Sequence, residues 1–247
     1  MRSVADIVYS ENTPERLDLH LPDSDTFPVF VYFHGGGFTG GDKGRHPVFY
    51  EYMTSRGIAV ASVNYRMYPS AQYPDFIVDC AAAVAWVAHN IGSYGNCTGV
   101  FVGGSSAGGY ASQLLCFDES WLTAAGVDPD GLAGFVHDAG QPTAHFKVLK
   151  ERGIDPRRVI VDETAPLYHV KDGRNYPPML VIVSDEDMEN RYEQTMLLIS
   201  TLGHFGYKDK VEFKLMHGKH CRYLDAVDEN GVSVFGQTVA PFIESKI

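Results

Sequence analysis

A serine framed by glycines follows a strand-like run in the middle of the chain. Gly104-Ser105-Ser106-Ala107-Gly108 fits the pattern Gly-x-Ser-x-Gly, after the apolar run Gly99–Gly103 and before the helix-like stretch Tyr110–Leu115. This context is typical of a nucleophile elbow, a strained strand-to-helix turn that lifts a serine hydroxyl above a sheet. The motif predicts that Ser106 is a nucleophile, although by itself it is also compatible with an ordinary glycine-rich turn.

A second glycine motif ends an earlier strand-like run. His34-Gly-Gly-Gly37 follows the apolar residues Val29–Phe33. Acyl transfer needs hydrogen-bond donors aimed at the oxygen on which negative charge develops. In lipases and esterases such a loop supplies these donors together with the amide that follows the nucleophile, here that of Ala107. Two such motifs after two separate strands predict an acyl-transfer site.

A nucleophilic serine also needs a base, expected late in the chain. His217 and His220 follow the apolar run Val211–Met216, and functional groups of open α/β sheets gather in loops at the carboxyl ends of strands. We favour His220, because it lies beyond Gly218 on the loop itself, whereas His217 is expected at the strand end.

The orienting acid is expected after the preceding strand. Met179–Val183 runs into a cluster that contains Asp185, Glu186 and Asp187. A buried strand must turn before its loop can reach an imidazole, which favours the later Asp187. Asp185 stays open as the alternative. The acid would hold the histidine in the required tautomer and stabilise it once it is protonated.

Short apolar runs alternate with helix-like stretches along the chain. We expect strands at Val4–Tyr9, Arg16–Leu21, Val29–Phe33, Ile58–Val63, Gly99–Gly103, Gly134–His137, Met179–Val183 and Val211–Met216. Helices are expected at Phe76–Asn90, Met188–Leu202 and Val232–Glu244, the last weakened by Gly236 and Pro241. This alternation predicts one α/β domain over residues 1–247, with a mostly parallel sheet, helices on both faces and a lid-like excursion over residues 117–178.

Composition excludes several classes of protein. The 247 residues are 45% hydrophobic, which excludes a disordered chain, and the net charge of −11 argues against nucleic acids and anionic membranes as partners. The four cysteines form no CxxC pair, so we expect no metal site and reduced thiols. There is no run of 18 apolar residues and no signal-peptide-like core near residue 1, from which we expect a cytoplasmic protein.

Taken together, these segments resemble the hormone-sensitive-lipase-like branch of the α/β-hydrolase esterases. The resemblance rests on His34-Gly-Gly-Gly-Phe38, Asn64-Tyr-Arg66, Pro74 with Asp79, Gly104-x-Ser106-Ala-Gly-Gly109 and the late Asp and His. It implies an eight-stranded sheet and no cofactor. Ser106 would be nucleophile, Asp187 acid and His220 base, with oxyanion amides from Gly36, Gly37 and Ala107. Arg66 and Asp79 would buttress the site. One departure is Ser105, where the family usually has an acidic residue.

We therefore expect a serine carboxylesterase that acts on short acyl esters, with acetyl groups on carbohydrate as the favoured substrate. Four polar residues after one strand, His137, Asp138, Gln141 and His145, are predicted to contact a hydrophilic alcohol, with ordinary loop hydrogen bonds as the alternative. An amide hydrolase (arylformamidase-like or peptidase-like) is the second interpretation, because the chemistry is shared. A non-catalytic binding protein is a remote third, and a homodimer stays open.

Overall fold

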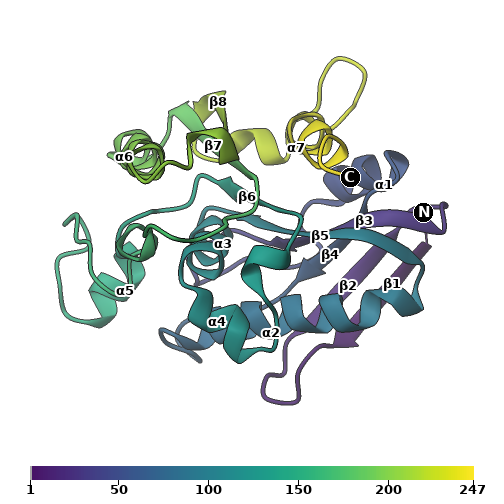
Figure 1. Ribbon diagram of the computed structural model, residues 1–247, viewed down its shortest axis with the longest axis horizontal. Coiled ribbons are helices and arrows are strands. Elements are labelled where there is room, and N and C mark those ends of the chain that lie inside the picture. Colours follow the sequence, from purple (N-terminus) through teal and green to yellow (C-terminus); the bar gives the residue numbers. More distant parts are fainter. Residues whose placement is uncertain (1) are drawn as a thin grey trace.

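The computed structural model describes residues 2–247, and its centre is an eight-stranded sheet (Figure 1). The strand order is β1-β2-β4-β3-β5-β6-β7-β8, and only β2 runs antiparallel to its neighbours. The strands are β1 (Arg2–Val8), β2 (Arg16–Leu21), β3 (Thr26–Phe33), β4 (Ala59–Val63), β5 (Asn96–Ser105), β6 (Gly134–Asp138), β7 (Met179–Glu186) and β8 (Val211–Lys219). All eight expected strands are present.

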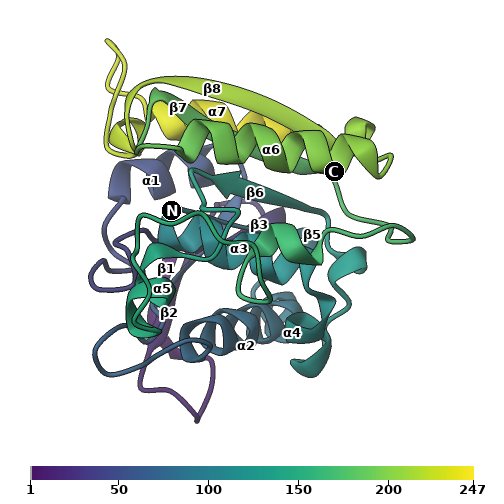
Figure 2. The ribbon, with the colours of Figure 1, turned by 90° about the vertical axis from the view of Figure 1, so that its left-hand side faces the viewer.

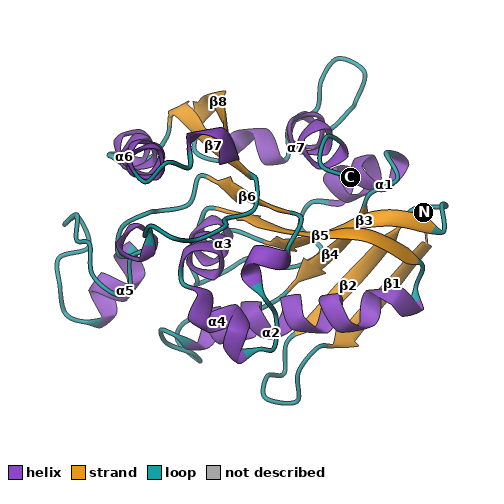
Figure 3. Ribbon diagram, viewed as in Figure 1, coloured by secondary structure: helices purple, strands orange, loops and turns teal. Residues whose placement is uncertain are grey.

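Helices cover both faces of this sheet, as Figure 3 shows by its colours. The helices are α1 (Pro47–Ser55), α2 (Asp75–Asn90), α3 (Ala107–Phe117), α4 (Glu119–Ala124), α5 (Phe146–Glu151), α6 (Arg191–His204) and α7 (Val234–Glu244). Short 3₁₀ turns are η1 (Ile91–Ser93), η2 (Pro129–Gly131), η3 (Pro166–His169), η4 (Lys208–Lys210) and η5 (Arg222–Leu224). The helices α2, α3 and α6 pack on one face and α1 and α7 on the other.

The central strand β3 shows why its sequence is continuously apolar. Successive side chains of a strand point to opposite faces, and both faces of β3 are covered. Val29, Val31 and Phe33 lie in the core beneath α2 and α3, whereas Phe30 and Tyr32 lie in the core beneath α1 and α7. The two hydrophobic cores therefore fix the orientation of this strand and of the glycine loop that follows it.

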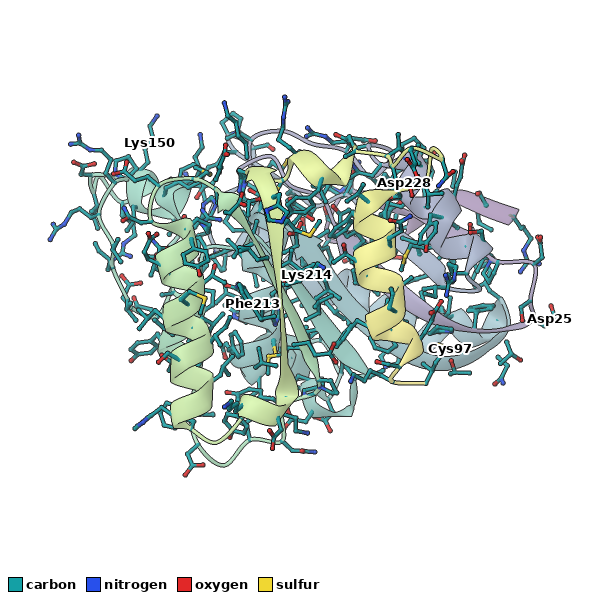
Figure 4. The ribbon with its side chains drawn as sticks, turned by 90° about the horizontal axis from the view of Figure 1, so that it is seen from above. Asp25, Cys97, Lys150, Phe213, Lys214 and Asp228 are labelled. Atoms are coloured by element: carbon teal, nitrogen blue, oxygen red, sulfur yellow. The ribbon has the colours of Figure 1, made fainter. Side chains whose placement is uncertain are left out.

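At the far edge, β8 runs between α6 and α7, as Figure 4 shows from above and Figure 2 from the side. Most residues of this strand are exposed, among them Phe213 and Leu215 at 40% and 37%. The strand nevertheless carries Met216 into the core and ends directly before His220. Its pairing with β7 thus brings the loops that contain Asp187 and His220 to the same end of the sheet.

Two expected helices differ in detail from the structure. The helix expected at Met188 begins at Arg191, because Asn190 adopts a left-handed conformation with φ 64° and closes the preceding loop. The last helix forms in spite of Gly236 and Pro241. A Cβ atom on Gly236 would lie 2.3 Å from the ring of Tyr52, so glycine there permits close packing of α7 on α1.

The lid-like excursion expected over residues 117–178 is not one segment in the structure. β6 divides it: residues 117–133, with α4, pack beside α2, and only residues 139–178, with α5 and η3, form an excursion from the sheet. The excursion packs on α3, where the Tyr110 hydroxyl donates a hydrogen bond to the carbonyl of Thr164. The excursion is shorter than expected because the predicted strand Gly134–His137 forms β6 within the central sheet.

The helix α2, together with η1, is long and apolar enough to cross a membrane by length and composition alone. In the structure its apolar side belongs to the hydrophobic core, where Phe76, Ile77, Cys80 and Val84 are fully buried. Core helices of folded domains commonly meet the same criteria. The length and composition of α2 are therefore accounted for by its packing on the sheet.

An ion pair with a buried carboxylate joins α2 to the loop after β4. The Arg66 guanidinium donates two hydrogen bonds to Asp79, at 2.8 Å each, and the backbone N–H of Arg66 donates a third. Thr13 donates a further bond to the same carboxylate, whose side chain is 3% exposed. This arrangement fits the predicted structural role of Arg66 and Asp79.

Arg66→Ala is expected to lower the free energy of unfolding by about 3 kcal/mol, because it leaves the buried Asp79 carboxylate without its cation. The measurement is denaturant unfolding at neutral pH. Arg157→Ala is the control, since Arg157 pairs with Asp155 on the surface and its loss should leave stability unchanged. Equal stability of Arg66→Ala and the native protein would contradict the structural role.

Candidate active site

Ser106 lies on a strained turn between β5 and α3. Its backbone has φ 57° and ψ −111°, a region that residues other than glycine rarely occupy and that costs on the order of 1–3 kcal/mol. Two backbone hydrogen bonds hold it there: its N–H donates to the carbonyl of Asp138 at 2.8 Å, and its carbonyl accepts from Tyr110 at 2.9 Å. The predicted nucleophile elbow is therefore present in the structure.

The glycines of this motif are required by close backbone contacts. A Cβ atom on Gly108 would lie 2.0 Å from the carbonyl oxygen of Phe33, and one on Gly104 would lie 2.6 Å from the same oxygen. The beginning of α3 thus packs directly against the end of β3. This contact places the serine turn and the glycine loop after β3 side by side.

His220 lies between Ser106 and Asp187. Its Nε2 atom is 2.8 Å from the Oγ atom of Ser106, and its Nδ1 atom is 2.6 Å from Oδ1 of Asp187. The geometry fits an Nδ1–H that donates to the carboxylate, which leaves Nε2 free to accept the serine proton. The structure thus brings together the three residues that the sequence predicted as nucleophile, base and acid.

The alternative residues form a separate pair of their own. His217 Nδ1 lies 2.6 Å from Asp185 Oδ2, but the His217 side chain is 90% exposed. In β8 it precedes Gly218, whose N–H also donates to Asp185. Asp185 is therefore engaged with His217 on the surface, and Asp187 is the carboxylate that reaches His220.

The Asp187 carboxylate is kept ionised although its side chain is only 1% exposed. Burial opposes ionisation, but the hydrogen bond and the charge interaction with His220 outweigh it, and the pKa of Asp187 lies below its ordinary value. The backbone N–H of Met188 and the charge of Arg191 act in the same direction. An ionised carboxylate at this position can stabilise a protonated His220.

The glycine loop begins at His34, which is held in place by Tyr65. The Tyr65 hydroxyl donates to the carbonyl of His34 at 2.6 Å, and the two rings stack at 4.6 Å. Gly36 has φ 123°, and a Cβ atom on it would lie 1.9 Å from the carbonyl oxygen of Gly40. Glycine is the residue that permits this tight loop.

Three backbone N–H groups beside Ser106 are free to bind a ligand. Within residues 2–247, the amides of Gly36, Gly37 and Ala107 donate no hydrogen bond to the protein. Ala107 is the first residue of α3, where the positive end of the helix dipole lies. These three groups are the ones predicted to hold an oxyanion.

A cavity of about 660 Å³ opens over Ser106 and His220. The residues that line it are Gly35, Gly36, Gly37, Arg45, His46, Ser106, Phe146, Met188, His220, Cys221, Arg222, Leu224, Asp225 and Ala226. Apart from the glycines, the serine and His220, the sequence had not singled these residues out as site residues. The available signal was closeness in sequence to predicted site residues: Met188 follows Asp187, and Cys221 and Arg222 follow His220.

The four residues predicted to contact an alcohol do not line this cavity. His137, Asp138 and His145 are at most 1% exposed, and Gln141 is 6% exposed. They make internal contacts: His137 with Ser112, Gln141 with Ala144, and His145 with the first turn of α5. The prediction is not supported for His137, Asp138 and His145, because β6 ends beneath the site rather than in it, and the alternative of ordinary internal hydrogen bonds fits them. Gln141 lines a second cavity, which shares Phe146 and Met188 with the first.

Asp138 is a buried carboxylate directly below the reacting groups. It pairs with Ser105 across the register of β5 and β6, and its Oδ1 atom accepts a hydrogen bond from the Tyr223 hydroxyl. Burial raises the pKa of Asp138 to about 7, although Ser105, Tyr223 and the charge of His220 act in the opposite direction. The fold therefore favours the protonated form of this acid.

The free energy of unfolding of Asp138→Asn, minus that of the native protein, is expected to increase as pH rises from about 4.5 to 7. The raised pKa means that native Asp138 contributes most stability below the unfolded pKa of about 4 and loses it as pH approaches 7, by up to about 1.4 kcal/mol per pH unit. Well above the folded pKa, from about pH 8, the difference should become constant. The measurement is denaturant unfolding across this range.

The exposed Asp209→Asn provides the matched control, since it removes a carboxylate from the surface. Its stability curve should run parallel to that of the native protein. A parallel curve for Asp138→Asn as well would contradict the raised pKa of Asp138.

In sequence, each match of this chain to a known family or protein covers less than half of its length. The family model described as BD-FAE matches residues 17–125, from β2 through the nucleophile elbow and α4. Esterase LipI of Mycobacterium tuberculosis is 41% identical over 96 residues, which cover 38% of this chain and 30% of LipI. The chain spans about a third of the length of the curated relatives it matches.

In structure, the similarity extends over the whole chain. The C6-C4 SN3-inhibited esterase B from Lactobacillus rhamnosis superposes with a TM-score of 0.80 and 20% identity, over 99% of this chain and 86% of that one. A truncated carbohydrate esterase from gut microbiota gives 0.79 and 19%, over 100% and 96%. Likeness at this identity shows a shared fold, and the predicted α/β fold with an eight-stranded, mostly parallel sheet is confirmed.

Proposed function

We propose that this chain, which has the α/β-hydrolase fold and resembles the hormone-sensitive-lipase-like esterases, is a serine carboxylesterase for short acyl esters. The observation that carries the proposal is the chain of hydrogen bonds from Ser106 through His220 to Asp187, at 2.8 and 2.6 Å, beneath an open cavity. The esterases among its relatives and structural neighbours support the same reaction class.

In the first half of the reaction, Ser106 Oγ attacks the ester carbonyl while His220 Nε2 takes its proton. The negative charge that develops on the carbonyl oxygen is stabilised by the amides of Gly36, Gly37 and Ala107, which have no partner in the protein. Asp187 stabilises the imidazolium. The alcohol leaves with the proton from His220, and an acyl group stays on Ser106.

In the second half, water enters from the open cavity and His220 takes a proton from it. The resulting hydroxide attacks the acyl group on Ser106, and the same three amides stabilise the second tetrahedral intermediate. Collapse of this intermediate returns the proton to Ser106 and releases the carboxylic acid. No cofactor takes part in this scheme.

The lining of the cavity supports short acyl groups. Phe146, Met188 and Leu224 are its large apolar side chains, and the remaining surface consists of glycine backbone and polar groups such as His46 and Asp225. A long acyl chain gains about 0.8 kcal/mol for each methylene that an apolar wall covers, and this cavity offers little such wall. The polar lining also supports a hydrophilic alcohol, which makes an acetylated carbohydrate our favoured substrate.

The native protein is expected to hydrolyse 4-nitrophenyl acetate and butyrate, with kcat/KM falling steeply toward octanoate and laurate. Ser106→Ala should lower kcat by roughly four orders of magnitude or more. The measurement is release of nitrophenol, with circular dichroism to verify that the variant is folded. Absence of ester hydrolysis by the folded native protein would overturn the proposal, and preference for laurate would overturn its short-acyl part.

The two neighbouring Asp–His pairs offer a matched test of the acid and the base. Asp187→Asn is expected to lower kcat by about 10³- to 10⁴-fold, because it disturbs the tautomer of His220 and removes the charge that stabilises the imidazolium. Asp185→Asn removes a carboxylate from the exposed pair with His217 and should change kcat less than twofold. Steady-state hydrolysis of 4-nitrophenyl acetate compares them, and equal losses would contradict the assignment.

A further inference from the structure

The unpaired arginines of this chain gather around the candidate active site. The sequence has eleven arginines, and eight of them donate a side-chain hydrogen bond to a carboxylate, a carbonyl or another acceptor. Within residues 2–247, the guanidinium groups of Arg45, Arg158 and Arg222 make no hydrogen bond or ion pair with the protein. Arg45 and Arg222 line the cavity over Ser106, and Arg158 lines a neighbouring cavity.

These arginines come from three separate segments of the chain. Arg45 follows the glycine loop, directly before His46 and α1, and Arg222 begins η5, two residues after His220. Both line the cavity that contains Ser106. Arg158 lies after α5 and lines a second cavity of about 480 Å³, which shares Phe146 and Met188 with the first.

Among the residues that line these two cavities, the arginines outnumber the carboxylates. Asp225 lines the first cavity, but its carboxylate accepts a hydrogen bond from His46 at 2.6 Å, and Glu189 lines the second cavity. In a chain with a net charge of −11, unpaired guanidinium groups confined to this region form a local positive site. A guanidinium with free donors binds carboxylates through paired hydrogen bonds.

We propose that the natural ester carries a carboxylate, which Arg45 and Arg222 bind beside Ser106, with Arg158 extending the positive lining away from it. The inference rests on the proposed esterase function and adds the chemical class of its substrate. The glycine-loop and η5 segments each supply one of the two arginines, so they recognise the charged part of the substrate as well as forming the wall of the cavity.

The test compares matched substrates that differ in one charge. On the acyl side, the 4-nitrophenyl monoester of succinate is compared with 4-nitrophenyl butyrate, after subtraction of the rate without enzyme. On the alcohol side, 4-acetoxybenzoate is compared with 4-acetoxybenzamide. Each substrate is measured with the native protein, Arg45→Gln and Arg222→Gln. Arg56→Gln is the control variant, because Arg56 pairs with Glu244 away from the cavity.

We expect Arg45→Gln and Arg222→Gln to lower kcat/KM for the charged member of one pair by about 10- to 100-fold, with less than a twofold change for its neutral partner. KM of the native protein for that charged substrate should rise with added salt, because ions screen the attraction. Arg56→Gln should behave as the native protein does.

Equal effects of the substitutions on charged and neutral substrates, or no effect on either pair, would overturn the inference. Both results are compatible with hydrolysis of the four esters by the native protein, so the proposed esterase function would stand. Failure of the folded native protein to hydrolyse any of the four esters would instead overturn the proposed function. The two proposals thus fail on different measurements.

Discussion

The site depends on the backbone contact between the beginning of α3 and the end of β3. Gly108 approaches the carbonyl of Phe33 so closely that no side chain fits between them. This contact holds Ser106 in its strained conformation and sets the Ala107 amide beside the glycine loop. The strain costs on the order of 1–3 kcal/mol, which the surrounding core and the hydrogen bond from Ser106 to Asp138 offset.

Two buried carboxylates near His220 have opposite electrostatic character. Asp187 is nearly inaccessible to solvent but accepts hydrogen bonds from His220 and from the backbone of Met188, and its pKa is lowered. Asp138 is more deeply buried and has fewer donors, and its pKa is raised to about 7. The number and charge of the donors that face each group, rather than burial alone, decide which acid is charged. A charged Asp187 is the form that the proposed mechanism requires.

The charged residues around the cavity are distinct from the groups proposed to react with the ester. Ser106, His220 and the free amides account for the chemistry of ester hydrolysis in general and carry no preference for a charged substrate. Arg45 and Arg222, which have no partner in the protein, lie on the wall of the same cavity. The two arginines lie on the segments after β3 and β8, which also carry Gly36, Gly37 and His220, whereas Ser106 and Asp187 follow β5 and β7.

The sequence by itself determined the strands, the mostly parallel sheet and Ser106 as the candidate nucleophile, because these depend on local patterns. It favoured His220 as base and Asp187 as acid, with Asp185 left open. Continuous apolar runs mark buried strands, and glycine is needed where backbones touch. Their order along the chain then limited the choice of base and acid. The boundaries were less well determined, as the later start of α6 and the division of the excursion by β6 show.

Only the tertiary structure decided what surrounds the reacting groups. Whether a polar residue at the end of a strand faces a cavity or the interior depends on what packs above it, which no local pattern contains. For this reason His137 and Asp138 are buried beneath the site, and Arg45, Arg158 and Arg222, from three distant segments, line the cavities at it. The separation of Asp187 from Asp185 likewise follows from the pairing of β7 with β8, which directs each carboxylate to a different histidine.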